Sequence, residues 1–262
     1  ESKLVDPGDA DHDPVNQPPQ DPYSLRCSPQ VIGAVREAVA YIQSMLEREI
    51  NAATDNPLLF VMDSDGLSRP YRAVSGGNFH GEPIALAMVH LRVAMTELAN
   101  LSERRVFWLT NPSMARGLPS MLVTGNESHI DSGWMIAQYV AAALVSDCRT
   151  LSHPDSVDNI PTSANQEDHV SMSMNAARHT HTVIEKIQSV VAIELVTLSV
   201  ALRHRLAGVQ RDGTIGNPVP ETELGSGARC FLEVLREVAP EILAIPLDRD
   251  VVIYPYIRHM TA

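Results

Sequence analysis

An octapeptide near the start of the chain, QDPYSLRC at positions 20–27, offers three functional groups at a spacing of three residues. In a helical turn, Gln20, Tyr23 and Arg26 would face the same way and present an amide, a phenol and a guanidinium to one ligand. A carboxylate suits such a trio, because the guanidinium fork matches its two oxygens. The spacing alone favours a simpler interpretation, a helix entrance whose arginine satisfies local carbonyl groups.

A glycine-rich stretch, SGGNFHGEP at positions 75–83, places Phe79 and His80 in a loop. Adjacent glycines permit close backbone approach, and a phenylalanine held in such a loop can wall an aromatic pocket. The alternative is a glycine turn that leads into a capped helix. A phosphate loop is disfavoured, because neither a preceding strand nor a lysine completes the pattern.

A third stretch, SANQEDHVSM at positions 163–172, concentrates carboxylates, amides and an imidazole at the predicted start of the longest helix. The helix dipole would favour Glu167 and Asp168 there, which is a sufficient structural explanation. The stretch lacks the paired histidines of the common zinc motifs, so no metal is expected. In the fourth stretch, 51–57, turn chemistry accounts for Asp55 and Asn56.

Apolar residues that recur every three and four positions indicate the elements that must position these groups. They predict helices over 28–50, 82–108, 132–151, 167–206 and 228–238. Between the first two, 51–83 is rich in turn residues and predicts a loop with at most a small hairpin. Alternating patterns are almost absent, so the predicted fold class is all-α, a bundle of long helices.

Two of these helices carry further expectations. The helix over 132–151 is apolar on nearly all sides, which indicates a buried helix. The helix over 167–206 would be about 60 Å long at 1.5 Å per residue. A helix of that length normally packs against other long helices, so an assembly of several chains is expected. Its histidines, His179, His181 and His204, are expected on exposed or mixed faces.

Composition excludes several classes of protein. Twenty Lys and Arg stand against 32 Asp and Glu, a net charge of −12, and no basic stripe indicates a nucleic-acid partner. No uninterrupted apolar run is long enough for a membrane span, and no signal peptide is recognised, so a cytoplasmic protein is expected. The three scattered cysteines are expected to be buried thiols. Prolines indicate an extended connector over 1–19, followed by one helical part over 20–262.

Five segments taken in order resemble the aromatic amino acid ammonia-lyase and aminomutase family, and within it the histidine ammonia-lyases. They are 20–27, 49–57, 75–83, 101–105 and 156–172. The similarity extends to about residue 206, and more weakly to 260. It implies the C-terminal helical part of a tetrameric enzyme whose active sites are shared between subunits. The implied reaction is non-oxidative elimination of ammonia from L-histidine, or a histidine-like amino acid, to give urocanate.

The resemblance also implies roles for individual residues. Arg26 is similar to the residue that binds the substrate carboxylate, and Tyr23 to a catalytic tyrosine close to the amino group. Gln20 and Phe79 resemble residues that line the pocket. Glu167 resembles the acid that faces the substrate side chain. A carboxylate pairs with an imidazole and not usefully with a phenyl ring, so Glu167 indicates histidine.

The family's electrophile is a methylidene-imidazolone formed from an internal Ala-Ser-Gly, and it captures the substrate amine. This chain contains no Ala-Ser-Gly and begins with Glu1 rather than Met. The resemblance therefore implies that the group lies in an N-terminal half outside this chain, and that the chain alone is inactive. The chain is then one part of a lyase, a fragment or a non-catalytic helical scaffold. An aminomutase, or a phenylalanine or tyrosine ammonia-lyase, is the chemical alternative.

Overall fold

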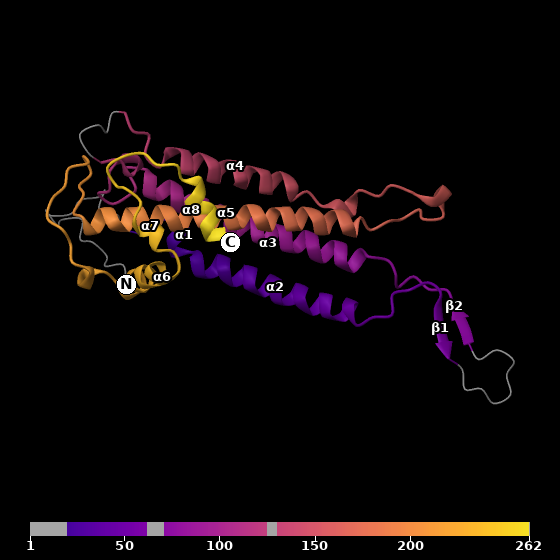
Figure 1. Ribbon diagram of the computed structural model, residues 1–262. Coiled ribbons are helices and arrows are strands. Elements are labelled where there is room, and N and C mark those ends of the chain that lie inside the picture. The colour runs from indigo at the N-terminus through magenta and orange to yellow at the C-terminus, as the bar shows by residue number, and fades with distance from the viewer. Residues whose placement is uncertain (1–19, 62–70, 125–129, 262) are drawn as a thin grey trace. The chain divides into compact units, whose positions relative to one another are not determined.

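The computed structural model describes residues 20–61, 71–124 and 130–261 (Figure 1). The predicted connector, 1–19, lies outside these residues. The helices are α1 (Tyr23–Arg26), α2 (Ser28–Ile50), α3 (Glu82–Thr110), α4 (Met135–Leu151), α5 (Ser173–Leu206), α6 (Ser226–Val238), α7 (Pro240–Leu243) and α8 (Tyr254–Thr261). The all-α prediction is confirmed, and the sequence did not predict α7 and α8.

The described residues contain one small sheet. Strands β1 (Leu58–Val61) and β2 (Tyr71–Val74) pair antiparallel, with Leu58 opposite Val74. This confirms the hairpin expected within 51–83. Short 3₁₀ turns occur at Ser120–Leu122, Asp155–Val157, Ser163–Asn165 and Glu221–Glu223.

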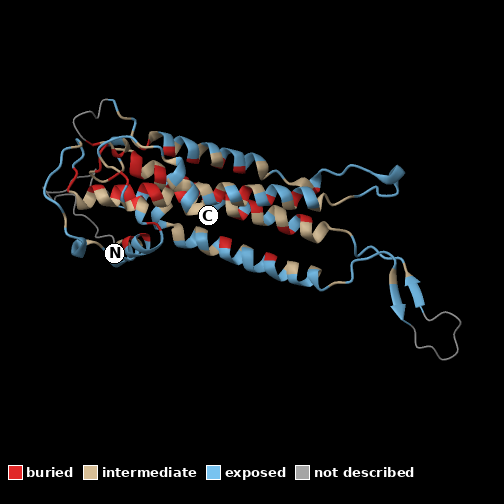
Figure 2. Cartoon of the chain, viewed as in Figure 1, coloured by how far each residue is buried: buried red, intermediate tan, exposed pale blue. Residues whose placement is uncertain are grey.

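Helix α4 begins three residues later than the apolar pattern predicts. The carboxylate of Asp250 accepts the backbone N–H groups of Ser132, at 2.8 Å, and of Gly133, at 2.7 Å. Gly133 also has a φ of 56°, which a helix does not allow. The expectation of a helix buried on all sides is wrong for this chain. One face is buried, through Ala137, Ala141, Val145 and Cys148, whereas Ile136, Tyr139 and Val140 are exposed (Figure 2).

Helix α5 begins at Ser173, six residues after Glu167, so the prediction that Glu167 lies at a helix start is wrong. Ser163, Ala164 and Asn165 have positive φ values of 52°, 54° and 68°, and Met172 has one of 51°. A helix requires negative φ values, so the chain reaches α5 through an irregular segment. The 34 residues of α5 span about 50 Å.

Contacts within the chain define two compact units. Unit 1 comprises Glu1–Val31, Glu97–Cys148 and Glu185–Ala262, and unit 2 comprises Ile32–Thr96 and Arg149–Ile184. Unit 1 contains most of the buried apolar side chains, from the C-terminal part of α3 to α7. Its largest fully buried apolar residues include Ile193, Leu232, Leu235, Ile242 and Ile245.

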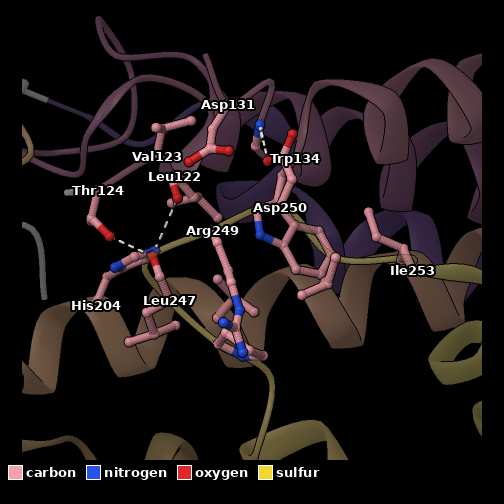
Figure 3. A pocket seen from close by; sticks show the side chains of 14 residues that line it. Leu122, Val123, Thr124, Asp131, Trp134, His204, Leu247, Arg249, Asp250 and Ile253 are labelled. Atoms are coloured by element: carbon pink, nitrogen blue, oxygen red, sulfur yellow. Dashed lines mark hydrogen bonds between the residues drawn. The ribbon is translucent and has the colours of Figure 1, made fainter. Parts of the chain in front are cut away.

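A buried histidine in unit 1 contradicts the expectation of a solvated imidazole. His204, on α5, is fully buried, and its Nε2 donates to the carbonyl oxygen of Leu122 at 3.1 Å (Figure 3). Burial lowers the pKa of His204 to about 4, against the smaller raising effect of that hydrogen bond. The imidazole is therefore neutral at pH 7. It lines a pocket with Trp134 of the α4 entrance and Arg249 near the C-terminus.

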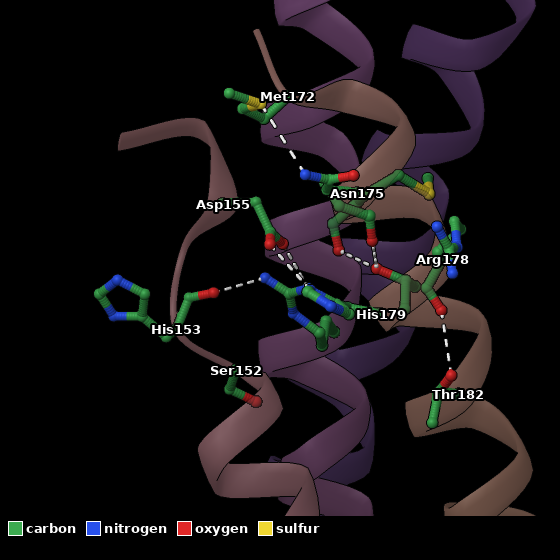
Figure 4. A network of polar contacts seen from close by, with 12 residues as sticks. Ser152, His153, Asp155, Met172, Asn175, Arg178, His179 and Thr182 are labelled. Atoms are coloured by element: carbon green, nitrogen blue, oxygen red, sulfur yellow. Dashed lines mark hydrogen bonds and ion pairs between the residues drawn. The ribbon is translucent and has the colours of Figure 1, made fainter. Parts of the chain in front are cut away.

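Unit 2 contains a buried ion pair. Arg92 of α3 is fully buried, and it donates from Nη1 to Asp155 Oδ2 and from Nη2 to the carbonyl oxygen of His153, both at 2.7 Å (Figure 4). His179 of α5 lies with Nδ1 2.8 Å from the second oxygen of Asp155. These bonds hold His153 and Asp155, which precede the segment that contains Glu167, against α3 and α5.

By length and composition alone, α3 could also span a membrane. This is weak support for a membrane protein, because the core helix of a soluble protein passes the same test. Arg92 in the middle of α3 is buried and ion-paired within unit 2, as expected of a core helix.

Candidate active site

Helix α1 places two of the three functional groups of the first stretch together. Arg26 lies with Cζ 4.9 Å from the centroid of the Tyr23 ring, so the two side chains share one face of the turn. Tyr23 is 70% exposed. Gln20 is also exposed but precedes the helix, which begins after Pro22, so it is not part of the same turn.

Two sets of contacts within unit 1 hold α1 in place. Asp21 forms an ion pair with Arg116, whose own carbonyl oxygen accepts a hydrogen bond from Arg205 of α5. On the other side, Ser28 Oγ donates to the carbonyl oxygen of Ser24 at 2.8 Å and is 3.4 Å from Nη1 of Arg105.

Arg105 is itself fixed by a bidentate ion pair with a carboxylate of α5. Its Nε and Nη2 donate to the two oxygens of Glu194, which also accepts the hydroxyl of Ser102. Such fork-to-carboxylate pairs fix orientation as well as distance. The segment 101–105 therefore helps to hold the start of α2, and α1 before it, against the core of unit 1.

The second stretch lies in unit 2, where side chains of the fourth stretch support it. Asn56 Oδ1 accepts the hydroxyl of Ser75 and the backbone N–H of Gly76, both at 3.2 Å. Asn78 Nδ2 donates to the carbonyl oxygen of Ala53 at 2.7 Å. The resulting loop presents Phe79, which is 55% exposed. Turn chemistry accounts for only part of the role of Asn56, because its side chain also holds this loop in place.

Glu167 lies in an exposed turn of unit 2 that its own contacts stabilise. Its Oε2 accepts the hydroxyl of Thr162 at 2.6 Å, and the backbones of the two residues form an isolated β-bridge. The strained residues 163–165 close this turn. Non-glycine residues with positive φ cost free energy, and such residues concentrate at functional sites.

A residue that the sequence did not single out holds the other side of this turn. Asn159 donates from Nδ2 to the carbonyl oxygen of Asp168 at 2.8 Å and accepts the N–H of Val170 at 2.9 Å. The sequence signal for Asn159 was its position inside the segment 156–172. This position did not single it out, because an asparagine in a loop can have many structural roles.

Within unit 2, the structure brings the second and third stretches together. His80, next to Phe79, stacks on His169, with ring centroids 5.6 Å apart and an angle of 29°. Gly81 is also close to the third stretch, because a Cβ at its position would lie 3.1 Å from Ser171 Oγ. Gln20, Tyr23 and Arg26 belong to unit 1, and Phe79 and Glu167 belong to unit 2.

Among the described residues, no group of three His, Cys, Asp or Glu side chains could hold a metal ion. Cys27 and Cys230 are free thiols. The expectation that the three cysteines are buried holds for Cys148, whereas Cys27 is half-buried and Cys230 is exposed.

Comparison with known proteins shows extensive similarity to one family. The family described as aromatic amino acid lyase matches residues 1–236. A histidine ammonia-lyase of Geobacillus thermodenitrificans is 53% identical over 186 residues, which cover 71% of this chain and 35% of that protein. The chain thus spans about a third of the length of the curated relatives it matches.

Solved structures show the same similarity. The crystal structure of histidine ammonia-lyase from Trypanosoma cruzi superposes with a TM-score of 0.74 at 39% identity, over 92% of this chain and 42% of that one. Tyrosine aminomutase from Streptomyces globisporus superposes with a TM-score of 0.74 at 33% identity, over 92% and 41%.

Proposed function

Because this chain belongs to the aromatic amino acid lyase family, we propose that it forms part of an enzyme that eliminates ammonia from L-histidine to give urocanate. The observation that carries this proposal is the exposed carboxylate of Glu167, held by Thr162 in a strained turn. A carboxylate presented in this way can accept a charge-assisted hydrogen bond from an imidazole ring.

The residues of the first stretch bind the other end of the substrate in this proposal. The guanidinium of Arg26 takes the substrate carboxylate through its two-pronged fork, while Gln20 and Phe79 line the pocket. The phenol of Tyr23 lies beside Arg26 and moves a proton near the substrate amino group.

Enzymes of this family use a methylidene-imidazolone formed from Ala-Ser-Gly. When bound, such an electrophile would supply the activation that makes the substrate amine a better leaving group. The 262 residues contain no Ala-Ser-Gly, so none of them can form the group. We propose that it comes from another segment of polypeptide, and the exposed phenol of Tyr23 fits a position beside it.

Apolar side chains left uncovered on the long helices support further subunits as partners. Helix α2 buries only Val35 and Ile42 among its described residues, whereas Ile32, Val39 and Tyr41 are exposed. Exposed apolar faces of this kind mark interaction surfaces. The free thiols of Cys27 and Cys230 suit a reducing compartment, which supports a cytoplasmic location.

The test of substrate choice is Glu167→Gln in the active enzyme that contains this chain. A glutamine oxygen can still accept the hydroxyl of Thr162, so the turn should keep its shape while the charge is lost. Histidine turnover should fall by about tenfold or more, because the charge-assisted bond to the ring is lost. Urocanate absorbance and melting temperature are measured on the same preparation.

Asp168→Asn is the matched control. It removes the same charge one residue away. Asp168 is exposed, and its contact with Asn159 is made by its backbone carbonyl oxygen, which the substitution leaves in place. The control should turn over histidine like the wild type. A wild-type rate in Glu167→Gln would refute the role of Glu167 in recognising histidine.

The similarity to tyrosine aminomutase supports a second candidate, in which the ammonia is added back at the β-carbon. Product analysis separates the two reactions. Accumulation of a β-amino acid instead of urocanate would favour the aminomutase.

A further inference from the structure

His80 is held by two backbone groups that together define its tautomer. Its Nδ1 accepts the N–H of Glu82 at 3.3 Å, and its Nε2 lies 3.1 Å from the carbonyl oxygen of His169. A backbone N–H can only donate and a carbonyl oxygen can only accept. The partners therefore assign a bare Nδ1 and a protonated Nε2.

The ring of His80 connects helix α3 to residues 162–170, which contain Glu167 and are called the Glu167 segment below. Glu82 is the first residue of α3, where the leading N–H groups have no partner inside the helix. His169 is two residues beyond Glu167, and its ring stacks on that of His80. His80 thus caps α3 with one nitrogen and binds the Glu167 segment with the other.

The Glu167 segment is bound from a second side by Asn159, through the backbone groups of Asp168 and Val170 that flank His169. The segment lies on the surface of unit 2, and Glu167 is exposed. Because few apolar contacts fix such a segment, its position depends on these hydrogen bonds.

We propose that His80 is a positioning residue, which sets the place of the Glu167 carboxylate through the carbonyl oxygen of His169. This inference rests on the proposed function of Glu167. A misplacement of about 1 Å at a reacting group can cost as much as ~100-fold in rate. Loss of this one bond should therefore reduce the rate although His80 itself does not touch the substrate.

Two substitutions separate the two bonds of His80. In His80→Asn, the short amide can occupy the Nδ1 position and cap Glu82, but it does not reach His169. In His80→Gln, the longer amide can donate from the Nε2 position to His169. In the active enzyme, kcat/KM for histidine should fall at least about tenfold in the Asn variant and stay within about threefold of wild type in the Gln variant.

Other orders of activity would overturn the proposal. Wild-type kcat/KM in both variants would mean that the bond to His169 has no influence on the reaction. A Gln variant as impaired as, or more impaired than, the Asn variant would assign the effect to the cap of α3.

A double-mutant cycle tests whether His80 acts through Glu167. Added to Glu167→Gln, His80→Asn should lower kcat/KM by no more than about twofold, because the carboxylate it positions is already absent. If the loss of kcat/KM in the double variant equals the product of the losses in the two single variants, the two residues act independently and the proposal is overturned.

Hydrogen exchange provides a readout that does not depend on activity. The amide of Val170 should exchange faster in His80→Asn than in His80→Gln, since the bond to His169 restrains this backbone. Equal exchange rates would overturn the positioning role. If Glu167→Gln alone keeps wild-type turnover, the proposed function fails, while the exchange comparison still decides the role of His80.

Discussion

The guanidinium of Arg26 lies over the ring of Tyr23, with Cζ 4.9 Å from the ring centroid, on a helix of a single turn. Both side chains face solvent in this chain. In the proposed function, this arrangement would present the fork of Arg26 to the substrate carboxylate and the phenol of Tyr23 to the same molecule.

Arg26→Lys should lower kcat/KM for histidine about tenfold or more in the active enzyme, mainly through a higher KM. A lysine ammonium is a point charge and cannot reproduce the bidentate fork or the stacking on Tyr23. Steady-state kinetics measure the effect, and Arg229→Lys, at an exposed position of α6, is the control that should change nothing. Unchanged kinetics in Arg26→Lys would exclude Arg26 from the site.

The 262-residue chain by itself should form no urocanate from histidine, because it contains no Ala-Ser-Gly from which the electrophile could form. Ultraviolet absorbance of the purified chain incubated with histidine is the measurement. Activity should appear only when a polypeptide that supplies Ala-Ser-Gly is present. Urocanate from the chain alone would contradict this expectation.

Asp155→Ala should lower the free energy of unfolding by about 3 kcal/mol, because it leaves the fully buried guanidinium of Arg92 without its carboxylate. The matched control is Asp147→Ala, which breaks an ion pair with Lys186 in which the aspartate side chain is 61% exposed. This change should cost less than about 1 kcal/mol. Urea unfolding compares the two, and equal losses would contradict the difference in burial.

Stability should fall in acid because of His204. Its pKa is lowered from 6.5 to about 4 in the folded chain, so the unfolded chain binds a proton more readily. The free energy of unfolding should therefore decrease as the pH falls from about 6.5 to about 4, by at most ~3 kcal/mol from this group.

His204→Gln should remove this dependence, because a glutamine does not titrate and its amide can still donate toward Leu122. Unfolding by urea at a series of pH values measures the slope. His153→Gln, at an exposed imidazole, should leave the slope as in the wild type. An unchanged slope in His204→Gln would contradict the assignment to His204.

The sequence by itself determined most of the helical architecture, and it predicted the residues of the candidate site. The limits of α2 agree with its apolar periodicity, because the free energy that builds a helix depends largely on neighbours three and four residues away. The spacing of Tyr23 and Arg26 likewise predicted a shared face, since one helical turn is enough to align them.

Only the tertiary structure decided where the functional segments leave the helices. No glycine or proline lies between Glu167 and Leu206, yet α5 begins at Ser173, because Asn159 and Thr162 bind the backbone and side chain of the preceding turn. Tertiary structure also decided the late start of α4, which depends on Asp250, 117 residues beyond Gly133. The burial of His204 depends on packing against Leu122, 82 residues away. Local periodicity contains no information about partners so distant in the chain, and the free energy of these contacts exists only once the fold has formed.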